Sequence, residues 1–153
     1  MGRFEARLRE LGLTLPEPPK PMATYATAVR MGELLYVSGT GPLLPDGSYV
    51  VGRLGADLDV AAGQAAARLC ALAMLATVRA QLGSVDAIAR IVKVLGFVNA
   101  TPEFVDHPKV MNGFSDLMVQ IFGDAGLGAR SAVGAPSLPS GIAVEVEAIF
   151  AVA

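Results

Sequence analysis

Three charged side chains near the end of the chain have types and a spacing that could do chemistry. Arg130 lies at the start of ARSAVGAPSLPSGIAVEVEAIF (129–150), and Glu145 and Glu147 lie in the strand-like run that ends it. A planar guanidinium suits bidentate capture of a carboxylate, and an acid on a partly apolar face needs either solvent or a partner. Arg130 and Glu145 together would make a small hydrolytic site that needs no cofactor. A surface role for Arg130 without any task is the alternative that these residues leave open.

The other candidate motifs indicate structural roles. Cys70 and His107 are the only cysteine and the only histidine, which is too few for a zinc site, so neither a metal nor a cofactor is predicted. Cys70 lies in an apolar helical pattern, where a buried thiol is inert. His107 precedes a helix-opening proline, where a loop or capping role is ordinary. The glycines of SGTGPLLPDG lack the spacing of a dinucleotide-binding fingerprint, and the chain has no P-loop.

The composition is that of a protein that must bury more apolar surface than a small monomer can. Of the 153 residues, 53% are hydrophobic and 17% are charged, which predicts oligomerisation. A net charge of -2 without a Lys/Arg cluster argues against a nucleic-acid partner. The start of the chain does not resemble a secretion signal, and the most apolar window, 69–78, is about half the length that spans a bilayer. The expectation is a single cytoplasmic domain over 1–153 with no membrane partner.

The predicted elements follow from hydrophobic periodicity and turn residues. Phe4, Leu8 and Leu11 predict a short amphipathic helix, and the proline-rich segment 15–21 predicts an extended linker. This N-terminal part, 1–21, would be an appendage to a core over 22–153. Strands are predicted at 24–30 and 33–39 around a Met31-Gly32 turn, near 49–52, and at 87–99, 129–134 and 142–152, with helices over 57–82 and from Pro108. The order β-β-β-α-β-α-β-β predicts an α+β fold with two helices on one face of a mixed sheet.

Alternate side chains of the last strand belong to two different faces. The first face holds Ile142, Val144, Val146, Ala148 and Phe150, and the second holds Ala143, Glu145, Glu147, Ile149 and Ala151. The first set suits packing under the helices. The second set mixes two acids with apolar side chains, as expected of a face that meets another subunit and includes a polar site. The strand at 87–99 is predicted to alternate in the same way, with Ile91, Lys93 and Leu95 on one face.

Two stretches carry a resemblance to a known family. ARSAV…LPSGIAVEVEAI contains Arg-Ser, a short Leu-Pro turn and a strand with Glu-x-Glu-Ala, and YATAVRMGELLYVSGTGPL contains an opening Tyr, a hairpin glycine and Ser-Gly-x-x-Pro. From about Tyr25 to Val152 the chain resembles the RidA/YjgF family, also labelled the L-PSP endoribonuclease family, and its N-terminal extension places it with longer members. The resemblance implies a chorismate-mutase-like fold, assembled as a homotrimeric barrel with ligand clefts between subunits.

The resemblance also implies an activity and a set of site residues. The activity is the cofactor-free hydrolysis of reactive 2-imino and enamino acids to 2-oxo acids and ammonia. Arg130 would bind the carboxylate of the small ligand, and Glu145 would position or activate the attacking water. The other residues implied in the cleft are Tyr25, Ser38, Gly39, Asn112 and, through its backbone, Ala132.

Some positions depart from the family pattern and keep two alternatives open. Ala132 stands where many members have cysteine, Thr40 and Gly41 replace the residues frequent after Ser-Gly, and the segment 101–112 is longer than the common family loop. The first alternative is a non-catalytic, regulatory trimer that binds a small carboxylate or a partner protein. The second is an endoribonuclease, which the acidic net charge disfavours. Glu147 could pair across an interface or support Glu145.

Overall fold

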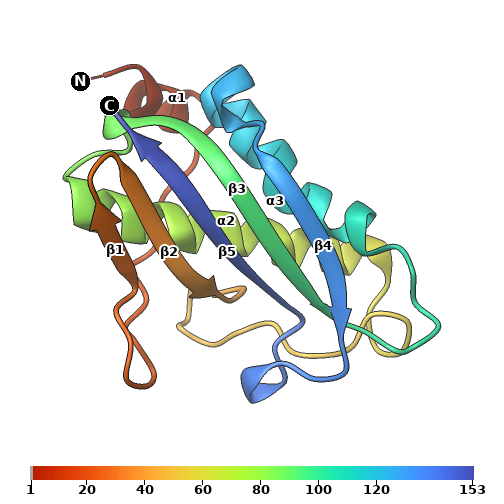
Figure 1. Cartoon of the computed structure of the whole chain (residues 1–153). Coiled ribbons are helices and arrows are strands. Elements are labelled where there is room, and N and C mark those ends of the chain that lie inside the picture. Colours follow the sequence, from red (N-terminus) through yellow and green to blue (C-terminus); the bar gives the residue numbers. More distant parts are fainter. Residues whose placement is uncertain (1) are drawn as a thin grey trace.

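A five-stranded mixed sheet with two long helices against one face forms the body of the computed structural model, which describes residues 2–153 (Figure 1). The elements are α1 (Arg3–Glu10), β1 (Ala28–Met31), β2 (Leu34–Thr40), α2 (Val60–Leu82), η1 (Val85–Ala87), β3 (Ile88–Asn99), α3 (His107–Phe122), η2 (Gly123–Gly126), β4 (Ala129–Ala135), η3 (Pro139–Gly141) and β5 (Val144–Val152). The strand order is β1-β2-β5-β3-β4, with β3 and β4 parallel and the other neighbours antiparallel. The predicted α+β class, with helices on one face of the sheet, is confirmed.

The strand predicted near 49–52 does not form. Tyr49 and Val51 make only isolated bridges, to Leu43 and Ile142 respectively. Gly52 adopts a φ of 131°, a conformation that interrupts regular strand pairing. The core therefore has the order β-β-α-β-α-β-β.

The first hairpin also turns one residue later than the sequence predicted. Met31 pairs with Leu34, so the two turn residues are Gly32 and Glu33. Gly32 has a φ of 60°, which a glycine adopts without steric cost.

The helix α2 crosses behind β2 and β5, and α3 lies behind β3 and β4 (Figure 1). The Asp59 carboxylate caps α2 by accepting from the Ala62 backbone N–H at 2.8 Å, and Gly83 ends the helix with a φ of 86°. By length and composition α2 could cross a membrane, but 56% of its most apolar window is buried inside the fold. The helix is therefore a core element, as the sequence predicted.

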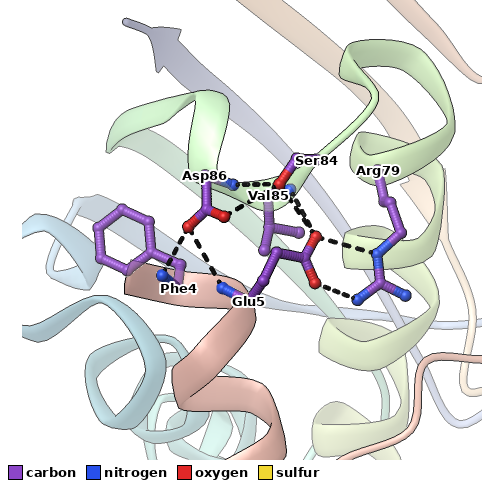
Figure 2. A network of polar contacts seen from close by, with 6 residues as sticks. All are labelled: Phe4, Glu5, Arg79, Ser84, Val85 and Asp86. Atoms are coloured by element: carbon purple, nitrogen blue, oxygen red, sulfur yellow. Dashed lines mark hydrogen bonds and ion pairs between the residues drawn. The ribbon is translucent and has the colours of Figure 1, made fainter. Parts of the chain in front are cut away.

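The N-terminal helix α1 is joined to the body by both polar and apolar contacts. The Asp86 carboxylate accepts from the backbone N–H groups of Phe4, at 2.6 Å, and Glu5, at 3.2 Å (Figure 2). These bonds satisfy N–H groups that have no partner within the helix. Leu8 is 1% exposed and belongs to the hydrophobic core. The amphipathic helix predicted from Phe4, Leu8 and Leu11 therefore forms and packs against the body.

Glu5 belongs to the same network, but here the carboxylate is on α1 and the donors are on the body (Figure 2). Its carboxylate accepts from the Val85 backbone N–H and the Ser84 hydroxyl, both at 3.1 Å, and from two nitrogens of Arg79 at 2.6 and 3.2 Å. Burial alone would raise the pKa of Glu5, but the hydrogen bonds from Arg79, Val85 and Ser84 outweigh burial and lower it.

We expect Glu5→Gln to lower the free energy of unfolding at neutral pH by about 1–3 kcal/mol, because it weakens charge-assisted bonds at a partly buried site. The lowered pKa of Glu5 means that this stabilisation is present above the ordinary carboxyl pKa and is lost as pH falls through the folded-state value. Urea unfolding at several pH values measures the difference. Glu10→Gln is the matched control, because Glu10 is exposed and, among residues 2–153, forms an ion pair only with Arg7. An equal loss in both variants, or a loss that does not shrink in acid, would contradict the role given to Glu5.

Candidate active site

Glu145 is a half-buried carboxyl on the sheet face that the helices leave open. It lies in β5 between the buried Val144 and Val146, which point toward the helices, and it is opposite Phe97 of β3. Burial, and then the charge of Glu147 on the same face, raise the pKa of Glu145. Among residues 2–153, no cation forms an ion pair with Glu145. Such a carboxyl can take and return a proton closer to neutral pH than an ordinary one.

A bulge in β2 places Ser38 and Gly39 beside this carboxyl. Val37 pairs with Ala148, but Thr40 pairs with Val146, so β2 holds one extra residue there. The Ser38 hydroxyl donates to the Ala26 carbonyl at 2.6 Å, which ties the bulge to the segment before β1.

Gly39 leaves the space that the Glu145 carboxyl occupies. A Cβ atom at position 39 would lie 2.9 Å from both Cδ and Oε1 of Glu145. Because real Cβ atoms do not approach a neighbour so closely, any side chain at this position would displace the carboxyl. The bulge and the absent side chain together fix where the Glu145 carboxyl sits.

Glu145 lines a cavity of about 560 Å³ together with three of the other predicted site residues, Tyr25, Ser38 and Gly39. Tyr25 is 45% exposed, and its hydroxyl accepts from the Met22 backbone N–H at 3.2 Å. The proline-rich linker and the loop before β5 contribute further walls, and so do Tyr49 and, from α2, Thr77. The structure therefore brings one half of the predicted site together within a single chain.

Arg130 belongs to a second group of side chains, on the helix side of the edge strand β4. Its guanidinium donates to Asn112 Oδ1 at 3.1 Å, to Ser115 Oγ at 3.2 Å and to the Pro108 carbonyl at 3.2 Å. Asn112 and Ser115 are three residues apart on α3, so they lie on one face of the helix. Ala132 follows two residues later on the same side of β4, half-buried against the core. These contacts hold the guanidinium in place at the edge of the sheet.

Arg130 and Glu145 lie on opposite faces of the sheet. Arg130 contacts α3, which covers one face, whereas Glu145 alternates with side chains buried under the helices and so points to the other. A single chain does not bring the two groups together. Among residues 2–153, no three His, Cys, Asp or Glu side chains gather where a metal ion could be held.

The family model described as "YjgF/chorismate mutase-like, putative endoribonuclease" matches residues 5–151. The chain belongs to the YjgF/RidA family. Protein TCP17 of Trypanosoma cruzi is 45% identical to this YjgF/RidA member over 149 residues, which cover 97% of this chain and 93% of TCP17.

Two solved structures resemble this YjgF/RidA protein along nearly its whole length. The protein Atu1372 of Agrobacterium tumefaciens, of unknown function, is 44% identical, with a TM-score of 0.89 over 98% of this chain and 92% of its own. A Shewanella oneidensis protein described as a "putative endoribonuclease" is 33% identical, with a TM-score of 0.93 over 98% of this chain and 99% of its own. Because the coverage includes nearly the whole chain, the N-terminal extension is common to this group of relatives.

The structure adds residues to the candidate site of this YjgF/RidA member that sequence reasoning missed. Ser115 accepts a hydrogen bond from the Arg130 guanidinium. Its spacing of three residues from Asn112 on a predicted helix was a signal that could have identified it. Lys20 and Ser140 line the cavity with Glu145. Ser140 has a left-handed φ of 58°, and no sequence pattern indicates that conformation at a serine. Cys70 is fully buried, as predicted.

Proposed function

We propose that this YjgF/RidA protein hydrolyses 2-imino and enamino acids to 2-oxo acids and ammonia without a cofactor. Glu145 carries the proposal, because it is a half-buried carboxyl with a raised pKa and faces a cavity large enough for a small acid. Family membership supports a RidA-type activity in general, and the sequence motifs around Arg130 and Glu145 support this particular reaction.

We propose a homotrimer as the active form. Arg130 lies on the edge strand β4, and the Glu145 cavity lies at the other side of the sheet, beside β2 and the linker. A head-to-tail contact repeated three times would close a ring and bring Arg130 of one copy to the cavity of the next. The open sheet face supports the assembly, since Val29, Met31 and Val133 are 53%, 71% and 43% exposed there.

In the proposed reaction, Arg130 binds the carboxylate of the substrate with its free N–H donors. Glu145 accepts a proton from a water molecule whose oxygen attacks the imine carbon, and a C–O bond forms as the C=N double bond becomes single. Proton transfer from Glu145 to nitrogen completes a carbinolamine. Glu145 then takes the hydroxyl proton and passes it to nitrogen as the C–O bond becomes double and the C–N bond breaks, which yields the 2-oxo acid and ammonia. An enamino acid first takes a proton on carbon to become the imine. Orientation supplies much of the rate, because the imine is already reactive.

The direct test is a coupled assay in which imines such as 2-aminoacrylate are generated in the presence of the protein. We expect wild-type protein to accelerate 2-oxo acid release, and we expect Arg130→Ala to lose most of that acceleration because it no longer binds the carboxylate. Imine decay at the same rate with wild type, with Arg130→Ala and with no protein would refute the proposal.

The pH dependence gives a separate prediction. The negative charge of Glu147 adds to burial in raising the pKa of Glu145, so Glu147→Gln should lower that pKa and move the acid limb of kcat/KM to lower pH. Profiles of kcat/KM against pH for wild type and variant measure the shift, and Glu10→Gln serves as a distant control. An acid limb that stays in place, or that moves to higher pH, would show that Glu145 is not the titrating group.

A trimer that binds small carboxylates without turnover is the second candidate function. Ala132 favours it, because this position lacks the thiol that many family members carry. It predicts protection against heat by 2-oxo acids that requires Arg130, with no acceleration of imine decay. An endoribonuclease is less favoured because of the net charge of -2. RNA cleavage that survives stringent purification and disappears in Glu145→Gln would establish it. A cytoplasmic location stays a prediction.

A further inference from the structure

One cation of the cavity has no part in the hydrolysis described above. Lys20 is the only Lys or Arg among the described residues that line the cavity, and Glu145 and Glu147 line it as well. Lys20 forms no ion pair with either acid or with any other residue in 2–153. An unpaired ammonium at the wall of a ligand cavity is available to an anionic group of the ligand.

The linker that presents Lys20 is held at both ends. On one side, α1 is anchored by Asp86, Glu5 and the buried Leu8. On the other side, Ser38 of β2 donates to the Ala26 carbonyl at 2.6 Å and to the Thr27 carbonyl at 3.0 Å, just before β1 begins. The prolines of the segment 15–21 restrict the backbone between these two anchors. The position of the Lys20 backbone at the cavity wall is therefore a consequence of the fold and not of a free N-terminal tail.

We propose that Lys20 selects ligands that carry a second carboxylate, so that the preferred substrates are 2-imino acids with an acidic side chain. This inference rests on the proposed function, in which Arg130 of a neighbouring copy binds the carboxylate next to the imine carbon. Lys20 then faces a different part of the same ligand. A cavity of about 560 Å³ has room for a side chain longer than that of a three-carbon imino acid.

The first experiment measures binding, so that it does not depend on turnover. The affinities of the full-length protein for 2-oxoglutarate, which has two carboxylates, and for 2-oxobutanoate, which has one, are compared by calorimetry. We expect a preference for 2-oxoglutarate that falls about tenfold in Lys20→Met and is retained in Lys20→Arg. Glu17→Gln is the matched control, because Glu17 is an exposed charge of the same linker that does not line the cavity.

The second experiment compares kcat/KM for imines generated from aspartate and from alanine by amino acid oxidases. We expect wild type to prefer the dicarboxylic imine, and we expect the ratio of the two values to fall about tenfold in Lys20→Met but not in Glu17→Gln. A wild type that hydrolyses both imines with no preference, or a Lys20→Met variant whose binding and kinetic ratios equal those of wild type, would overturn the inference and leave the hydrolase intact. A Lys20-dependent preference in binding, without turnover of either imine, would refute the proposed hydrolysis and support the role of Lys20.

Discussion

Mixed oligomers of Arg130→Ala and Glu145→Gln chains are expected to recover about one quarter of the wild-type activity, although each variant alone retains only a small fraction of it. The reason is the position of the two residues on opposite faces of the sheet. Suppose that each site takes Arg130 from one copy and Glu145 from the next. A Glu145→Gln chain still supplies Arg130, and an Arg130→Ala chain still supplies Glu145. A site is therefore complete when the first copy is a Glu145→Gln chain and the second is an Arg130→Ala chain. In random assembly from equal amounts, each condition is met about half the time.

The measurement is imine hydrolysis after the two variants are unfolded together and refolded as a mixture. Each variant refolded alone is the control for activity that returns without mixing, and the two refolded variants combined afterwards are the control for exchange. No recovery in the co-refolded mixture, with oligomers of normal size, would contradict a site shared between copies. That result would mean that Arg130 and Glu145 of different copies do not act in one site.

Much of the fold was predictable because the last strand and the second long helix follow simple periodicities. In β5, Val144, Val146 and Phe150 are all fully buried, as their alternation predicted. In α3, the predicted apolar stripe that includes Phe114 and Leu117 is buried against the sheet. These elements obey a single repeat from end to end, so the chain alone shows which side chains point inward.

The alternation predicted for β3 is confirmed from Lys93 to Gly96, but it fails at Ile91 and Val92 because the strand contains register shifts. The shift between Ile91 and Lys93 puts Ile91 on the same buried face as Val94, although the two are three residues apart. Pairing partners decide where a bulge forms, and a partner strand distant in sequence is not visible in the local pattern. The bulge of β2 beside Gly39 escaped prediction for the same reason.

The candidate site was predictable as a set of residues but not as an arrangement. The motifs indicated Arg130 and Glu145, yet the parallel pairing of β3 with β4 places Arg130 against α3, away from the Glu145 face. The inclusion of the linker in the cavity depends on the contacts that anchor α1 through Asp86. Such contacts between segments far apart in the sequence have no local signature, so the sequence alone does not place Lys20 at the cavity.

Glu145→Gln is expected to lower hydrolysis at least about 100-fold while it raises the thermal stability of the protein at neutral pH. The loss of activity follows because an amide cannot accept the proton from water. The gain in stability follows from the raised pKa of Glu145, since burial disfavours its charged form in the folded state. The folded state then binds this proton more tightly than the unfolded state, so stability falls as pH rises from the ordinary carboxyl pKa through the raised value.

The sign of this effect can be measured by thermal unfolding of wild type and Glu145→Gln at several pH values. Glutamine does not titrate, so the variant should be more stable than wild type at about pH 8. The difference should shrink as pH falls and vanish below about pH 3, where Glu145 is protonated in both states. Glu103→Gln, at an exposed loop position, is the control for a general change in net charge. A variant less stable than wild type at neutral pH would contradict the prediction. It would mean that a cation, such as Arg130 of a neighbouring copy, stabilises the charged carboxylate of Glu145 more than burial disfavours it. The same pair of curves therefore tests both the environment of Glu145 in one chain and the approach of a second chain to it.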